Sequence, residues 1–127
     1  MNHRWIAIGA LMGLLAVIAG TFAAHGLDQR LSPDMLKVFE TGVRYHMYHA
    51  LAILVAALIG GDASKRLPSI AAGCFLMGIV FFSGSLYLLA ITGAKWLGMI
   101  TPVGGVSFLA GWGVLATTGM TRRPCSK

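Results

Sequence analysis

The chain contains little charge. Only 11% of its 127 residues are Asp, Glu, Lys or Arg, and only four of these are acidic. A soluble globular domain carries about 25% charged residues. Either most of the surface therefore faces something other than water, or the chain aggregates. The length is that of one domain, so residues 1–127 are expected to form a single unit.

Cysteine is also scarce, because the chain has only Cys74 and Cys125. The first lies in the middle of a long apolar stretch, and the second lies in the tail. If the apolar stretches are straight helices that cross a membrane, these two thiols are too far apart to bond. We therefore expect two unpaired cysteines rather than a disulfide framework.

What the sequence does contain is a set of long windows free of charge, at residues 5–27, 45–61, 67–94 and 96–121. A bilayer core of about 30 Å is crossed by about 20 apolar residues in a helix. The pattern predicts an all-α integral membrane protein, a four-helix bundle in a single transmembrane domain. The expected spans are about 5–24, 45–60, 68–92 and 97–119.

The segment before the second span predicts a short amphipathic helix at the membrane interface. Ser32 can cap a helix, Pro33 is tolerated at its first position, and Asp34 suits the positive end of its dipole. Apolar and charged side chains then fall on different faces, as in an interfacial helix. The apolar face holds Met35, Leu36, Phe39 and Val43, and the charges are Lys37, Glu40 and Arg44. Gly42 is expected to mark a bend into the span.

The net charge of +6 is not arranged for nucleic acid, because the basic residues lie between apolar spans and not in a stripe with aromatics. The lipid bilayer is the expected partner. Cytoplasmic connections tend to hold more Lys and Arg. With both termini cytoplasmic, the inside holds Arg4, Lys65, Arg66, Arg122, Arg123 and Lys127, against Arg30, Lys37, Arg44 and Lys95 outside. We therefore expect a bacterial plasma (inner) membrane protein with both termini in the cytoplasm.

Glycines in the spans are expected to let helices approach closely, since small residues line helix contacts in lipid. The candidates are Gly9, Gly13, Gly20, Gly84, Gly104 and Gly105. The G-x-x-x-G pair at Gly9 and Gly13 leaves homo-oligomerisation open as an alternative to packing within one chain. Pro102, followed by two glycines, predicts a kinked or partly unwound outer end of the fourth span.

Polar residues gather toward one end of the expected bundle. These are His25, Glu40, Arg44, His46, His49, Ser83, Tyr87 and Thr101. With alternating spans all of them lie toward the outer leaflet, and ionisable groups inside a span are functional candidates by default. Because the connection between the first two spans is short, His25, Arg44 and His49 are predicted to lie near one another.

Metal and catalytic motifs are weak in this set. His46 and His49 are three residues apart and share a helix face, which allows a shared metal. A lone H-x-x-H without a third ligand favours hydrogen bonding to neighbouring helices, with a proton relay or ligand contact as the alternative. Ser83 does not lie in a G-x-S-x-G motif, and no base is identified for it. No metal, cofactor or catalytic residue is expected.

The stretches 20–27, 40–50, 82–87 and 101–105 resemble, in order, those of the domain-of-unknown-function 423 family. These are small bacterial inner-membrane proteins related to the eukaryotic transmembrane protein 256. The resemblance implies four spans and a plasma-membrane location, and it implies no activity. Its motif residues correspond to His25, Gly26, Tyr45, His49, Ser83, Gly84, Tyr87, Thr101, Pro102 and Gly104. It also implies Gln more often than His at position 46 in relatives, which weakens a two-histidine metal site.

Three functions remain open at this point. The favoured one is a non-enzymatic structural or regulatory membrane bundle. A small-solute or proton-coupled carrier or channel, using the polar residues near the outer leaflet, is the second, and a membrane metalloprotein or enzyme is the third. A polar cavity that reaches the middle of the membrane would favour the carrier. An interior packed with Gly and Ala would favour the structural bundle.

Overall fold

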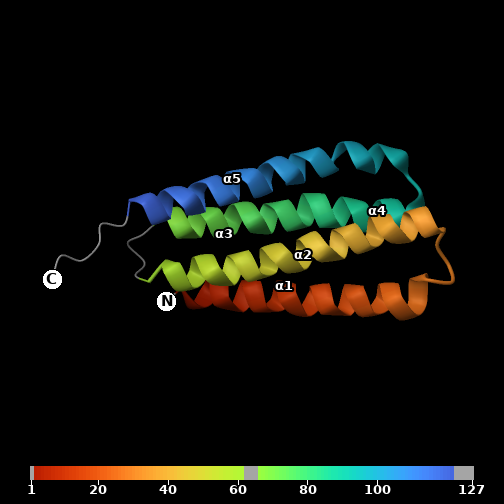
Figure 1. Cartoon of the computed structure of the whole chain (residues 1–127), viewed down its shortest axis with the longest axis horizontal. Helices are drawn as coiled ribbons and strands as arrows, with labels where there is room; N and C mark the ends of the chain where they lie inside the picture. The colour runs from red at the N-terminus through yellow and green to blue at the C-terminus, as the bar shows by residue number, and fades with distance from the viewer. Residues whose placement is uncertain (1, 62–65, 122–127) are drawn as a thin grey trace.

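The computed structural model describes residues 2–61 and 66–121, and over these ranges its secondary structure is entirely helical (Figure 1). Helical rods cover His3–Leu27, Pro33–Ile59, Arg66–Thr92 and Lys95–Met120. Each is long and apolar enough to cross a bilayer. The predicted all-α membrane fold with four spans is confirmed.

Three of the four rods combine different kinds of helix. Helix α1 covers His3–Phe22 and ends in a π-helical turn, Ala23–Leu27. The third rod is α3, Arg66–Gly78, then a π-helical turn, Ile79–Ser83, then α4, Gly84–Thr92. The fourth rod begins with a 3-10 turn, Lys95–Met99, and continues as α5, Thr101–Met120. Gly93 ends α4 at a φ of 70°, a conformation that glycine adopts readily.

Helix α2 covers Pro33–Ile59 without a break, so the predicted amphipathic helix is not a separate element. Its start is as predicted, since the Ser32 hydroxyl accepts a hydrogen bond from the Met35 amide at 3.3 Å. Gly42 is buried inside the helix, where the Tyr87 ring lies against it. The glycine thus admits a neighbouring side chain and does not mark a bend.

The outer end of the fourth span is irregular, but the irregularity precedes the glycines. The 3-10 turn ends at Met99, and Pro102 falls in the first turn of α5, where no backbone donor is required. Gly104 and Gly105 are regular α-helix. The irregular segment therefore lies a few residues before the position that the sequence predicted.

The rods are antiparallel and α2 lies in their middle (Figure 1). Helix α1 packs on one side of α2, while α3 and α4 pack on the other and carry α5 on their far side. The beginning of α1 and the end of α5 lie at the same end of the molecule (Figure 1). Both outermost helices expose large apolar side chains, including Leu14, Ile18, Val106 and Leu109. In a membrane these side chains face lipid.

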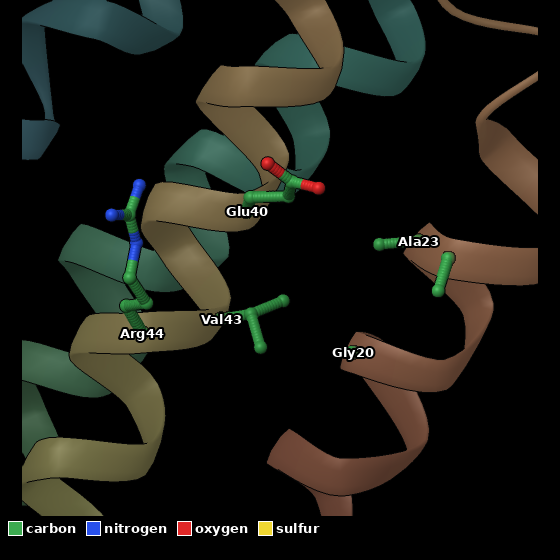
Figure 2. A pocket seen from close by; sticks show the side chains of 6 residues that line it. Gly20, Ala23, Glu40, Val43 and Arg44 are labelled. Atoms are coloured by element: carbon green, nitrogen blue, oxygen red, sulfur yellow. The ribbon is translucent and has the colours of Figure 1, made fainter.

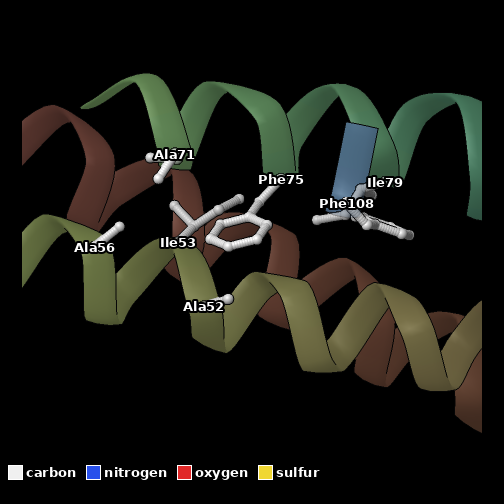
Figure 3. Packing of buried hydrophobic residues seen from close by; sticks show 8 residues of the cluster. Ala52, Ile53, Ala56, Ala71, Phe75, Ile79 and Phe108 are labelled. Atoms are coloured by element: carbon white, nitrogen blue, oxygen red, sulfur yellow. The ribbon is translucent and has the colours of Figure 1, made fainter. Parts of the chain in front are cut away.

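The largest buried cluster among the described residues joins α2, the third rod and α5 (Figure 3). Alanines dominate it and let the α2 and α3 backbones approach, while Phe75 fills the space between them. Phe75 and Ile53 are fully buried. The cluster consists of Ala52, Ile53, Ala56, Ala71, Ala72, Phe75, Ile79 and Phe108. At this level the interior is closed by packed side chains.

The glycines predicted to mediate packing divide into two groups. A Cβ on Gly9 would meet Leu54, a Cβ on Gly20 would meet Val43, and a Cβ on Gly104 would collide with the backbone of Phe82. These three glycines therefore lie at contacts between helices.

The other three predicted glycines do not lie at close contacts. A Cβ on Gly13 or Gly84 would meet nothing within 4 Å, and one on Gly105 would only touch the Phe82 ring, at 3.9 Å. Gly13 therefore does not contact another helix within the described chain, because α1 turns only a narrow face toward α2. Gly78 and Gly111, which the sequence did not single out, lie directly against Phe108 and Phe75.

Some predictions concern residues outside the described ranges. The cytoplasmic turn at 62–65 and the basic tail at 122–127 belong to this part, as does Cys125. Cys74 lies within the described chain and is a free thiol.

Candidate functional site

The structure separates the predicted polar residues into a buried and an exposed group. His46, His49 and Ser83 are buried, and Tyr87 and Thr101 are half-buried. The exposed members are His25, Glu40 and Arg44. The eight residues thus do not form a single site.

His49 uses both ring nitrogens inside the bundle. Its Nδ1 lies 2.7 Å from the Tyr45 carbonyl oxygen, which can only accept, so Nδ1 carries the proton. Its Nε2 then accepts a hydrogen bond from the Trp112 indole N–H at 3.2 Å. This pattern requires the neutral Nδ1–H tautomer. The Phe108 ring stacks on the imidazole with centroids 3.5 Å apart and planes 9° apart.

An aromatic groove of about 420 Å³ lies beside His49, between α2 and α5. Its outer residues Tyr48, Leu109 and Trp112 are exposed on the lateral surface of the bundle. The groove is lined by Tyr45, Tyr48, His49, Phe82, Gly105, Phe108, Leu109 and Trp112. Its walls are thus mostly aromatic and aliphatic, and the one imidazole in it is already hydrogen-bonded.

His46 differs from His49 because only one of its nitrogens has a partner. Its Nδ1 shares a hydrogen bond of 3.0 Å with the Tyr87 hydroxyl, which joins α2 to α4. The side chain is 5% exposed, and Nε2 is buried without a hydrogen-bond partner among the described residues. A buried polar atom without a partner destabilises the fold by about 1–3 kcal/mol. This atom is therefore the one polar anomaly in the described interior.

The remaining buried hydroxyls are paired within the bundle. The Ser83 hydroxyl donates to the Gly42 carbonyl oxygen at 2.7 Å, which joins the third rod to α2. The Ser85 and Thr101 hydroxyls lie 2.7 Å apart and join α4 to α5. These hydrogen bonds join neighbouring rods inside the bundle.

Glu40 and Arg44 of α2 line a cleft between α2 and α1. The Glu40 side chain points toward α1, whereas the Arg44 side chain extends along α2 (Figure 2). The cleft has a volume of about 370 Å³, and its far wall is formed by Gly20, Ala23 and Ala24. The carboxylate and the guanidinium point in different directions, and within the described part of the chain no ion pair joins them (Figure 2).

His25 does not join Arg44 or His49. It is exposed in the π-helical turn and lines a separate hollow with residues of its own helix, among them Val17, Thr21 and Phe22. Ala23 and Leu27 occupy the buried positions of that turn. Arg44 and His49 are five residues apart, which is about 140° around a helix, so they face different neighbours. A short connection brings helix ends together but does not decide which side chains meet.

The part of the chain that the structure describes holds no group of three or more His, Cys, Asp and Glu side chains placed to bind a metal. His49 could bind one only after losing a hydrogen bond to Tyr45 or Trp112. The described residues therefore offer no assembled ligand set.

Sequence reasoning missed Phe108 and Trp112. They are four residues apart in the fourth span, so they lie on one face of α5. That spacing was visible in the sequence. The contact of these aromatic side chains with a histidine on another helix could not be predicted, because the sequence does not show which helices are neighbours.

Four apolar helical rods with polar side chains bonded to one another in their interior define a multi-pass α-helical membrane protein. The chain belongs to the family described as "Protein of unknown function (DUF423)", whose model matches residues 19–105. The resemblance inferred from four short stretches is thereby confirmed. The matched region contains every predicted polar residue and ends before Phe108 and Trp112.

Similar proteins in bacteria are named as membrane proteins. The chain is 48% identical over 111 residues to a UPF0382 membrane protein of Staphylococcus epidermidis, covering 87% of this chain and 90% of the relative. It is 47% identical to the UPF0382 membrane protein YwdK of Bacillus subtilis, with coverage of 85% and 89%. A UPF0382 membrane protein of Haemophilus influenzae is 39% identical, with coverage of 91% and 93%. No solved structure matches the chain.

Proposed function

We propose that this membrane protein is a non-enzymatic bundle with a structural or regulatory role, acting through the surface that it presents to lipid and to neighbouring proteins. The observation that carries this proposal is the pairing of its buried polar groups with one another. The His49–Trp112, Ser83–Gly42 and Ser85–Thr101 hydrogen bonds each join two rods. Groups bonded in this way hold helices in place and are not free to bind a substrate.

The position of the hollows supports the same proposal. The α1–α2 cleft and the α2–α5 groove both lie between pairs of helices and have exposed residues at their edges. At another level of α2, alanines and Phe75 pack its contact with α3. A carrier requires polar groups along a path that crosses the membrane. The described interior offers isolated hydrogen-bonded pairs instead.

The proposed location is the bacterial plasma membrane, with both termini in the cytoplasm. The antiparallel rods support a common side for the two ends, since α1 begins where α5 ends (Figure 1). The excess of Lys and Arg at that end supports the cytoplasmic side.

A second candidate function is a proton-coupled carrier, favoured by the buried Nε2 of His46, which has no partner among the described residues. A transient water or substrate could complete the bonding of this atom, and the adjacent Tyr87 hydroxyl could exchange a proton with the ring.

Proton flux separates the two candidates. The full chain is reconstituted in liposomes that enclose a pH-sensitive dye, and a potassium gradient with valinomycin supplies the driving force. We expect the same rate of acidification as in liposomes without protein. A faster rate that is abolished by His46→Gln and retained by Tyr48→Phe, an exposed tyrosine on the same helix, would overturn the structural proposal.

A further inference from the structure

The charges of the α1–α2 cleft lie near the end of the first rod that is formed by Leu27. Gly20 of α1 lies against the Val43 side chain, so Arg44 is at about the level of Gly20. Leu27, the end of the first rod, is seven positions after Gly20, which corresponds to about 10 Å along a helix. Glu40 lies one turn nearer to that end. The guanidinium of Arg44 extends back along α2 toward the level of Glu40 (Figure 2).

Neither charge has an ionic partner in the part of the chain that the structure describes. Both side chains are exposed, and no ion pair joins either of them to another described residue. An unpaired charge in the middle of a bilayer is unfavourable by about 2.5–3.5 kcal/mol or more, and charged groups closer to the end of a span pair with an opposite charge or extend to the headgroups. A partner at this cleft that carries both an anion and a cation would pair with both side chains.

We propose that this cleft binds the headgroup of a zwitterionic phospholipid with a primary ammonium, as in phosphatidylethanolamine. Arg44 donates to the phosphate oxygens, for which a guanidinium is suited because it can form two parallel hydrogen bonds. The Glu40 carboxylate accepts hydrogen bonds from the ammonium. The volume of about 370 Å³ next to these charges receives the glycerol and the first part of an acyl chain.

Glu40 and Arg44 follow one another along α2 in the order in which the ammonium and the phosphate follow one another in the lipid. Arg44 is the deeper residue, and the phosphate is the deeper group because it is attached to the glycerol. Glu40 is nearer to the end of the helix, and the ammonium follows the phosphate through a short ethylene link. The far wall contains Gly20, Ala23 and Ala24, whose small side chains let a lipid approach the α1 backbone.

The chemistry of the cleft distinguishes among common lipids. Phosphatidylcholine offers the phosphate, but its quaternary ammonium has no N–H to donate to Glu40. Phosphatidylglycerol offers the phosphate and no cation, which leaves the Glu40 carboxylate next to an added negative charge. Binding should therefore be strongest for phosphatidylethanolamine. This site does not depend on the proposed function, because lipid binding and proton flux are measured separately.

Native mass spectrometry of the full chain, released from detergent micelles with added lipid, tests the proposal. The wild-type protein should retain phosphatidylethanolamine in preference to phosphatidylcholine and phosphatidylglycerol. Glu40→Gln should remove the preference over phosphatidylcholine. Arg44→Gln should weaken retention of both lipids by about tenfold, the effect expected when charged hydrogen bonds are lost. Lys37→Gln is the matched control, since Lys37 is an exposed charge on α2 outside the cleft.

Circular dichroism verifies that each variant is helical. Arg44→Lys is a second test, because it keeps the positive charge but loses the planar guanidinium and its parallel N–H donors. Equal retention of the three lipids, or unchanged selectivity in both Glu40→Gln and Arg44→Gln, would overturn the proposal. So would a dimer that needs Glu40 and Arg44 and forms without any lipid preference, because a second copy would then supply the opposite charges. The same spectra resolve dimers and lipid adducts by mass.

Discussion

Trp112 donates its indole N–H to Nε2 of His49 at 3.2 Å, and this bond joins α5 to α2 across the edge of the aromatic groove. The bond depends on a second one, because the Tyr45 carbonyl holds the proton on Nδ1 and leaves Nε2 as an acceptor. The backbone of α2 thus sets the tautomer of His49, and this tautomer lets Nε2 accept a hydrogen bond from Trp112.

Replacing Trp112 with Phe should destabilise the protein by about 1–2 kcal/mol, since Nε2 of His49 loses its donor while an aromatic ring remains. The free energy of unfolding is measured by titration with SDS in mixed micelles, followed by circular dichroism. Trp96→Phe is the control. Trp96 is 59% exposed and Trp112 is 48% exposed, so the two substitutions remove similar amounts of buried ring surface. Equal effects of the two variants would mean that the indole N–H contributes nothing.

Tyr87→Phe should destabilise the protein by a similar amount, about 1–2 kcal/mol, because both ring nitrogens of His46 would then lack a described partner. The ring of Tyr87 still covers Gly42 and stays next to Phe39, whose centroid is 4.7 Å away. Tyr48→Phe, at an exposed position on α2, is the matched control. In a His46→Gln background the effect of Tyr87→Phe should change, since contacting residues are not additive. Strict additivity would contradict a direct bond.

The fold was predictable because the decisive signal is local. A charge-free window of sufficient length predicts a span whatever its neighbours are, and the pattern Ser32-Pro33-Asp34 indicated the start of α2. The separate amphipathic helix expected before Tyr45 was wrong, because α2 runs from Pro33 to Ile59 without a break. Charged side chains do not end a helix, and Glu40 and Arg44 lie on the exposed face of this one.

The site was less predictable because it depends on which helices are neighbours. The sequence showed that His46 and His49 share a helix, but not that one meets Tyr87 and the other meets Trp112. His25 was placed near them by the length of a connection, and the π-helical turn directs Ala23 and Leu27 inward in its place. Gly13 likewise belongs to a G-x-x-x-G motif, which predicts a helix contact, yet a Cβ at this position would meet nothing within 4 Å.

A topology experiment tests the proposed orientation. A reporter inserted at Gly93–Ala94, between the third and fourth rods, should report the periplasm, and one fused after Lys127 should report the cytoplasm. The two reporters should lie on opposite sides of the membrane because the rods are antiparallel, and the excess of Lys and Arg assigns the side of each. If the first reports the cytoplasm and the second the periplasm, only the proposed orientation is contradicted. If both report the same side, the four spans are contradicted.

The contact between α5 and the π-helical turn of the third rod provides the sharpest test of packing. A Cβ on Gly104 would collide with the backbone of Phe82, which cannot yield as a flexible side chain could. Gly104→Ala should therefore separate the two rods and destabilise the protein by about 1–3 kcal/mol, the range found for overpacked interiors.

Gly113 supplies the matched control, since it lies on the same helix and a Cβ there would meet nothing within 4 Å. Gly113→Ala should be neutral or stabilise the protein by up to about 1 kcal/mol, because alanine has the higher helix propensity. Both variants add one methyl group to α5, so any difference between them in SDS titrations reports the position of that group. If Gly104→Ala is as stable as Gly113→Ala, the fourth rod does not pack closely against Phe82, and the nearby hydrogen bond between Ser85 and Thr101, which needs the same close approach, would not form.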